Sequence, residues 1–102
     1  MSKYKITQKQ VTLAKRLREI REEKELTLTL AAAMIKIDPA VLSKIETGKR
    51  KINRKVLSAL SKAYRIDSKE LLKLYYSEYI LHLLSLEENP KEFLIYTLKS
   101  LK

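Results

Sequence analysis

Residues 27–48 read TLTLAAAMIKIDPAVLSKIETG, and this stretch decides the fold because it encodes two short helices and a tight turn. The hydroxyl of Thr27 can cap a first helix over residues 28–35 by accepting hydrogen bonds from its free backbone amides. Helical spacing gives this helix an apolar face made of Ala31, Ala32 and Ile35. A break at Lys36 and Ile37 then separates it from the next helix.

The second helix of the stretch is predicted over residues 39–46. Asp38 offers an N-cap acceptor, and Pro39 suits the first helical position because its missing N–H costs nothing there. Gly48 ends the helix, since glycine tolerates the left-handed conformation that follows many helices. The 3.6-residue period divides it into an inward face of Leu42 and Ile45 and an outward face of Pro39, Ala40, Ser43, Lys44 and Thr47.

The outward face carries groups that can read DNA bases. Two short helices joined by a tight turn, with polar residues outward on the second, fit the major groove. Lys44 can donate to guanine O6 and N7, Ser43 can bond a base edge or a phosphate, and Ala40 can contact a thymine methyl group. Only Lys44 and Ser43 offer hydrogen-bond readout, so we expect DNA shape and dimer spacing to contribute to specificity.

A basic segment follows this helix. Residues 49–55 read KRKINRK, which is five cations in seven residues without an acid. Such a run is often a solvated loop, but its place after the outward-facing helix favours contact with the sugar-phosphate backbone. If about four to six phosphates are neutralised, the slope of log K against log salt is about −4 to −5 per subunit. The expected phosphate contacts are Lys49, Arg50, Lys51, Arg54 and the helix start at Thr27.

Composition sets the fold class. The chain has 102 residues, of which 45% are hydrophobic and 33% charged, with one Gly and two Pro, and this predicts a single all-α domain. Asp67-Ser-Lys-Glu70 has capping-box spacing at the start of a helix. Further helices are expected over residues 9–24, from Asn53 through Ala63, from Asp67 through Leu86, and after Asn89-Pro90.

Charge points to a polyanionic partner. Lys and Arg number 22 against 12 acids, so the formal charge is +10 at pH 7. Residues 1–8 carry cations without a helical apolar stripe, and they are predicted to form a flexible basic arm. The first-helix cations Lys15, Arg16 and Arg18 are interpreted as solubility charges.

Several classes of site are not expected. The chain has no cysteine for disulfides or thiolate metal ligands, and its one histidine, His82, cannot form a metal cluster by itself. No nucleophile-base pair can be assembled, so we expect no enzyme, no cofactor and no metal. We infer no small-molecule effector, because the core or an interface requires all the apolar positions. No spanning stretch or signal-peptide core is apparent, which favours the cytoplasm and no membrane contact.

The C-terminal residues 73–102 form a separate feature. They hold most of the tyrosines and the only phenylalanine, and an apolar surface of this kind usually marks a partner interface. We interpret it as a dimerisation element; alternatively, the last helix folds back over the preceding one within one chain. The expected interface consists of Tyr75, Tyr76, Tyr79, Ile80, Leu83, Leu84 and Phe93.

The runs LAKRLREIREEKELTL at 13–28 and IDPAVLSKIETGKRKINRKVLSALSKAYRIDSKELL at 37–72 resemble the phage-repressor-like (Xre-type) helix-turn-helix family. The resemblance covers residues 11–72, and residues 42–50 are its most specific part. It implies a five-helix DNA-binding domain, usually a dimer on a two-fold-related operator, that most often regulates transcription. It also implies base-facing positions at Ala40, Ser43 and Lys44 and backbone-facing positions at Lys49 and Arg50.

Three positions depart from the family pattern. Lys36 stands where the turn glycine is common, and it is tolerable because non-glycine residues enter the left-handed region at a modest cost. Ala31 stands where leucine is usual. The usual Gln at the start of the first motif helix, which contacts phosphate in many members, is Leu28, so that role is not carried over.

These observations predict a homodimeric, sequence-specific regulator of transcription that binds a pseudo-palindromic operator in double-stranded DNA, as a repressor or autoregulator. Its parts are the arm at 1–8, the DNA-binding domain at 9–72 and the helical extension at 73–102. Alternatively, it is an antitoxin or adaptor that holds a protein partner through the extension and uses the DNA domain for autoregulation. A controller beside a restriction-modification operon is a variant of the first hypothesis.

Overall fold

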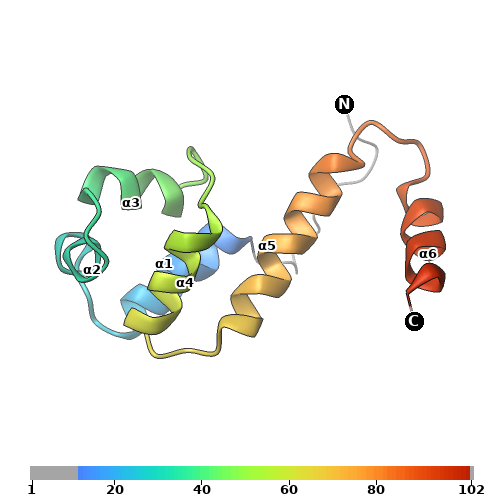
Figure 1. Ribbon diagram of the computed structural model, residues 1–102. Coiled ribbons are helices and arrows are strands. Elements are labelled where there is room, and N and C mark those ends of the chain that lie inside the picture. The colour runs from blue at the N-terminus through green and yellow to red at the C-terminus, as the bar shows by residue number, and fades with distance from the viewer. Residues whose placement is uncertain (1–11, 102) are drawn as a thin grey trace.

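The computed structural model describes residues 12–101, which form helices and no strands, as the all-α prediction requires. Figure 1 shows α1 to α4 gathered at one end, α5 leading away from them, and α6 standing apart on the far side of α5. The predicted arm at 1–8, the predicted helical residues 9–11 and Lys102 lie outside the described residues. The helices are α1 (Leu13–Glu23), α2 (Leu28–Met34), α3 (Pro39–Glu46), α4 (Arg54–Ala63), α5 (Ser68–Leu83) and α6 (Pro90–Ser100).

Side-chain caps start the first five helices. The predicted caps Thr27, Asp38, Asn53 and Asp67 each accept a hydrogen bond from a backbone amide in the first turn. The cap of α1 is not among the predicted ones. Thr12 is extended and accepts from the amide of Lys15, so this helix begins at Leu13 rather than near Lys9.

The predicted capping box at 67–70 does not form. The Asp67 carboxylate accepts from the amide of Lys69, while the Glu70 carboxylate is bound by the Arg16 side chain at 2.6 Å. Arg16 is therefore a link between α1 and α5 rather than a solubility charge, and its ion pairs with Glu19 and Glu23 extend the link. The tertiary ion pair takes the carboxylate that a local cap would need.

Helices α1 to α4 end in the same left-handed turn. The residue after the C-cap has positive φ at Glu25, Lys36, Gly48 and Arg65. After α2, for example, the amide of Ile37 donates to the Ala32 carbonyl at 3.0 Å and that of Lys36 to the Ala33 carbonyl at 3.2 Å, which is the Schellman pattern. Lys36 thus adopts, at φ 60°, the conformation in which the family's glycine is favoured.

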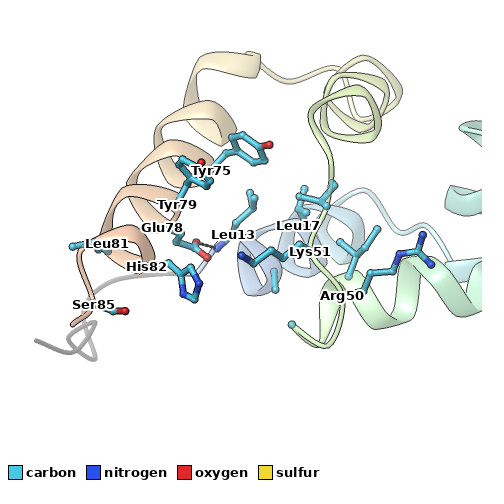
Figure 2. A pocket seen from close by; sticks show the side chains of 14 residues that line it. Leu13, Leu17, Arg50, Lys51, Tyr75, Glu78, Tyr79, Leu81, His82 and Ser85 are labelled. Atoms are coloured by element: carbon cyan, nitrogen blue, oxygen red, sulfur yellow. Dashed lines mark hydrogen bonds between the residues drawn. The ribbon is translucent and has the colours of Figure 1, made fainter. Parts of the chain in front are cut away.

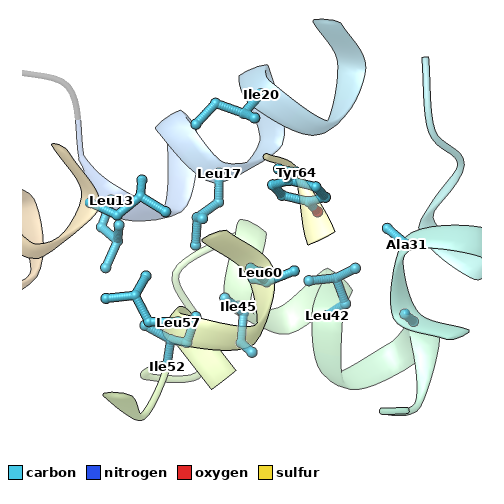
Figure 3. Close-up of a cluster of buried hydrophobic side chains, with 12 residues drawn as sticks. Leu13, Leu17, Ile20, Ala31, Leu42, Ile45, Ile52, Leu57, Leu60 and Tyr64 are labelled. Carbon is cyan, nitrogen blue, oxygen red and sulfur yellow. The ribbon is translucent and has the colours of Figure 1, made fainter. Parts of the chain in front are cut away.

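One hydrophobic core joins helices α1 to α5. Figure 3 shows Leu17 and Tyr64 near its centre, with Ala31 at the edge where α2 approaches α3. Ala31 and Ala32 are fully buried, so small side chains let these two helices lie close together. The other buried apolar residues are Leu13, Ile20, Leu42, Ile45, Ile52, Leu57, Leu60 and Leu71.

A buried ion pair crosses this core. Arg21 donates from Nε to Glu46 at 2.8 Å and from Nη2 to the other Glu46 oxygen at 3.1 Å. Its Nη1 donates to the Leu26 carbonyl at 2.6 Å. The hydrogen bond to Glu46 outweighs burial and raises the pKa of Arg21. The pair connects α1, the turn before α2 and the last residue of α3.

We expect Arg21→Ala or Glu46→Ala to lower the free energy of unfolding by about 3–5 kcal/mol, because each leaves a buried charge without its partner. The combined change Arg21→Met with Glu46→Leu should recover most of that loss. Urea denaturation followed by far-UV circular dichroism measures both effects. Single variants within about 1 kcal/mol of the parent would contradict the role assigned to the pair.

Tyr64 makes stability depend on alkaline pH. Burial, and next the Glu46 carboxylate, raise its pKa from 10.0 to about 12, and its hydroxyl hydrogen-bonds to no described residue. The folded state favours the neutral phenol, so this contribution is complete below about pH 10 and is lost as pH rises toward 12. Relative to the parent, Tyr64→Phe should gain about 2 kcal/mol of stability between these limits, measured by denaturation at several pH values. If the free energy of unfolding of the two proteins changed with pH in the same way, the raised pKa of Tyr64 would be contradicted.

The positive-φ residues after α2 and α3 can be exchanged in opposite directions, by adding a glycine after α2 and removing the one after α3. Lys36→Gly should raise the free energy of unfolding by about 1 kcal/mol, and Lys36→Ala, which removes only the charge, should not. Gly48→Ala should lower it by a similar amount through the backbone alone, because a Cβ there meets nothing within 4 Å. Thermal unfolding of the three variants measures these differences, and a stabilising Lys36→Ala would show that charge is the cause.

Candidate nucleic-acid interface

Helix α3 presents one face to solvent. Leu42, Ile45 and Glu46 are buried on its inner side, and the last of these is fixed by the ion pair with Arg21. The inner side therefore sets the rotation of the helix about its own axis. The predicted outward face lies opposite, with Ser43 half-buried and with Pro39, Ala40, Lys44 and Thr47 exposed.

The polar side chains on this face differ in whether they already bond to other groups of the protein. Lys44 is exposed and forms no ion pair with any residue in the described range 12–101. The hydroxyl of Thr47 donates to the backbone carbonyls of Ser43 at 3.0 Å and of Lys44 at 3.2 Å. Thr47 therefore caps the end of its own helix, which leaves Lys44 and Ser43 as the side chains best placed to donate to a base.

The loop after α3 is held at both ends. At its start, the amides of Lys49 and Arg50 donate to the carbonyl of Lys44 at 2.9 and 3.2 Å. Further along, the side chain of Ile52 is buried in the core. Lys49, Arg50 and Lys51 are exposed between these anchors, so the loop presents its cations beside α3. Sequence reasoning did not single out Ile52, although an apolar residue within a basic run is a usable signal.

Arg54 and Tyr76, which the sequence assigned to different surfaces, meet in the same chain. Arg54 Nη1 donates to the Tyr76 hydroxyl at 3.0 Å, and its guanidinium lies 5.8 Å from the centroid of that ring. Tyr75 packs edge-on against Tyr76 at 5.2 Å between centroids. Arg54 keeps further N–H donors for a phosphate, but its position now depends on α5.

Thr27 is exposed at the start of α2, where its hydroxyl accepts from the amide of Leu30 at 3.1 Å. It lies at the opposite end of the motif from the basic loop in the sequence. Its side chain is therefore committed to capping, and only the helix start around it is left for a phosphate.

The large exposed apolar side chains gather at the C-terminal end. Apart from Leu30 and Met34 on α2, all those within residues 12–101 lie from Tyr76 onward. Helix α5 continues through the predicted domain boundary at Leu72 and ends at Leu83, short of the predicted Leu86. Of the predicted interface residues, Tyr75 and Leu84 are half-buried, and the exposed ones are Tyr76, Tyr79, Ile80, Leu83 and Phe93.

The alternative in which the last helix folds back over the preceding one is wrong. Figure 1 shows α6 separated from α5, and α6 packs closely against none of the other described helices. Only Pro90 of this helix is buried, while Tyr96 is 75% and Leu98 68% exposed. The six-residue corner between α5 and α6 carries Leu86, which is 80% exposed.

A groove of about 530 Å³ lies between α1, the loop after α3 and α5, and we name it the α1–α5 groove. Figure 2 shows Leu13, Leu17 and Tyr75 within it and the cations Lys51 and Arg50 along the loop side. The Glu78 carboxylate accepts from the backbone amide of Leu13, as the dashed line marks. Its further lining residues are Ala14, Ile45, Gly48, Ile52, Tyr79, Leu81, His82 and Ser85.

Within residues 12–101 no group of three or more histidine or acidic side chains is placed to hold a metal ion. None of the helices in this range is long and apolar enough to cross a membrane. The α1–α5 groove is not foreseen by the sequence, because its walls come from three segments far apart along the chain.

Comparison with known proteins agrees with this geometry. The helix-turn-helix family profile matches residues 17–71, which is more than half of the chain. A comparison with curated protein sequences finds no match. Among solved structures, the chain is similar to the clp gene regulator ClgR from C. glutamicum, at 24% identity and a TM-score of 0.57. That match covers 65% of this chain and 86% of ClgR, and at this identity it concerns the fold.

The matched segment runs from α1 into α5 and includes α2, α3 and the loop after it. It therefore contains the buried Arg21–Glu46 pair, the exposed face of α3 and the basic loop. The chain belongs to the Xre-type helix-turn-helix family and is an all-helical, DNA-binding regulator of transcription.

Proposed function

We propose that this protein represses or autoregulates transcription as a homodimer bound to a pseudo-palindromic operator in double-stranded DNA. The observation that carries the proposal is the exposed face of α3, fixed in orientation by the Arg21–Glu46 pair and flanked by a basic loop. A helix of two turns with one polar exposed face enters the major groove without rearrangement. A bound dimer represses by occluding the promoter.

Base contacts are assigned to α3. Lys44 donates to guanine O6 and N7, Ser43 donates to a base edge, and Ala40 contacts a thymine methyl group. Pro39 and Thr47, the other exposed residues of the face, lie at its two ends. The small number of hydrogen-bonding side chains makes DNA shape and half-site spacing part of the specificity.

Phosphate contacts are assigned to the flanks of α3. Lys49, Arg50 and Lys51 lie exposed on the loop that Ile52 anchors, and this arrangement supports contact with one strand. Arg54 adds a donor from the first turn of α4, and the helix start at Thr27 adds backbone amides on the other side of the motif. The +10 charge strengthens attraction to any DNA and carries no sequence information.

Dimerisation is assigned to the C-terminal extension. Its exposed apolar side chains, from Tyr76 to Leu101, form a surface of the kind that stable interfaces bury. A two-fold-symmetric dimer would place two copies of α3 on successive turns of the same face of DNA. The interface residues of this proposal are Tyr75, Tyr76, Tyr79, Ile80, Leu83, Leu84 and Phe93.

The same exposed surface supports a second candidate, an antitoxin or adaptor that holds a different protein. Such a protein would keep the DNA-binding domain for autoregulation. Purification from the native host distinguishes the two candidates, because a stoichiometric second protein favours the adaptor and recovery of homodimer alone favours the regulator.

Substitutions in α3 and in the loop should have different effects on DNA binding. The combined change Ser43→Ala with Lys44→Ala should reduce discrimination between operator and random DNA by about 1–3 kcal/mol for each bidentate hydrogen-bonded pair that it removes. Lys49→Ala with Lys51→Ala should weaken binding to both kinds of DNA alike and reduce the salt slope by about one for each lysine. Fluorescence anisotropy on operator and scrambled duplexes, over a series of salt concentrations, measures both quantities.

The operator for this experiment comes from a selection on random DNA, and Lys62→Ala, an exposed cation near the end of α4, is the matched control. The control should leave discrimination unchanged. A selection that enriches no motif, or a Ser43/Lys44 variant with the parent's discrimination, would refute base readout by α3.

A further inference from the structure

Helix α6 lacks a packing partner among the described residues. It exposes Phe93, Leu94, Ile95, Tyr96 and Leu98, and its C-cap Leu101 is exposed too, with exposed fractions from 37% to 75%. An isolated helix of 11 residues is at best marginally stable in water, because nucleation is costly and few hydrogen bonds repay it. The helix therefore needs an apolar surface that covers one side of it.

The α1–α5 groove is an apolar surface of the complementary kind. Leu13 and Leu17 line the α1 side, the rings of Tyr75 and Tyr79 line the α5 side, and Ile45 is a further apolar lining residue. Its volume of about 530 Å³ is enough for several large side chains projecting from one helix. The Glu78 carboxylate within it accepts a hydrogen bond from the Leu13 amide, which holds this side chain against the start of α1.

Charge at the edge of the groove favours the start of α6. Arg50 and Lys51 line the loop side of the groove. Helix α6 has an acid, Glu92, in its first turn, and Phe93 follows it directly. The Glu92 carboxylate can pair with a cation of this edge, although the same turn also carries Lys91, and Phe93 can enter the apolar groove.

The two surfaces lie on opposite sides of α5 in one chain. The groove is on the side of α1, whereas Figure 1 shows α6 beyond the other side of α5. The corner at residues 84–89 directs α6 away from the groove of its own chain. The α6 that fills the groove would therefore come from a second copy of the chain.

We propose that α6 of each protomer docks in the α1–α5 groove of its partner, so that two helices are exchanged around a two-fold axis. This inference rests on the homodimer of the proposed function. It identifies the contact that holds the two protomers together. Each of the two grooves holds the α6 of the other protomer, so no groove or α6 is left to bind a third copy. The result is a closed dimer rather than a chain of subunits. The exchanged helix then lies against the loop that holds Arg50 and Lys51, so dimerisation orders the residues assigned to phosphate contact.

Cross-linking tests the exchange directly, because the chain has no cysteine of its own. One sample carries only Ala14→Cys, on α1 at the groove, and the other carries only Leu94→Cys, on α6. After unfolding and refolding together, a bismaleimide with a spacer of roughly 10 Å, longer than a disulfide reaches, should join the two chains into a covalent dimer. Replacing the first variant with Ser58→Cys, exposed on α4 outside the groove, should give little product.

A chain that carries both cysteines distinguishes exchange from docking within one chain. Exchange predicts covalent dimers, while a cross-linked monomer, or equal product with the Ser58→Cys control, would overturn the proposal. Sedimentation equilibrium of the unmodified protein tests the homodimer separately from the docking of α6 in the groove. A monomer refutes the dimer of the proposed function, whereas a dimer that yields no Ala14–Leu94 product refutes only the docking of α6 in the groove.

The combined change Leu94→Asp with Leu98→Asp provides an independent measurement. It should raise the dimer dissociation constant at least tenfold, as measured by sedimentation, and leave the cooperative unfolding of the α1–α5 unit in place. A matched change of the exposed polar residue Ser77→Asp on α5, which does not line the groove, should have little effect. An unchanged dimer in the Leu94/Leu98 variant would overturn the proposed exchange.

Discussion

The buried ion pair between Arg21 and Glu46 is the constraint on which the proposed DNA-reading surface depends. Glu46 is the last residue of α3, and the Arg21 guanidinium binds both of its oxygens and the carbonyl of Leu26. A buried carboxylate needs its partner, so α3 cannot rotate without exposing a charge to the core. The position of α1 thereby determines which side of α3 faces outward.

The basic loop and the C-terminal extension are joined through contacts with α5 and the core. Ile52 anchors the loop in the core, Arg54 is hydrogen-bonded to Tyr76 on α5, and Arg50 and Lys51 form one wall of the α1–α5 groove. Helix α5 in turn is joined to α1 through the Arg16–Glu70 pair and the hydrogen bond from Leu13 to Glu78. Residues assigned to phosphate contact and to self-association therefore share the same supports.

Helix α5 packs into the core near its start and is exposed near its end. Its first turn packs into the core through Leu71, while Tyr79, Ile80 and Leu83 near its end are exposed. Exposed apolar surfaces of this kind usually mark sites where another molecule binds. The extension that begins there accounts for nearly all the exposed apolar side chains in residues 12–101, which distinguishes it from the DNA-binding unit and supports the proposed association.

The sequence by itself determined the features that depend on neighbours within about four residues. The caps at Thr27, Asp38, Asn53 and Asp67, the bounds of α3 and its division into buried and exposed faces all follow from local spacing. The tertiary structure alone decided which distant groups meet. It paired Glu70 with Arg16 instead of a capping box, Arg21 with Glu46, and Arg54 with Tyr76. Each of these partners is chosen by burial and proximity across the core, which no local pattern encodes.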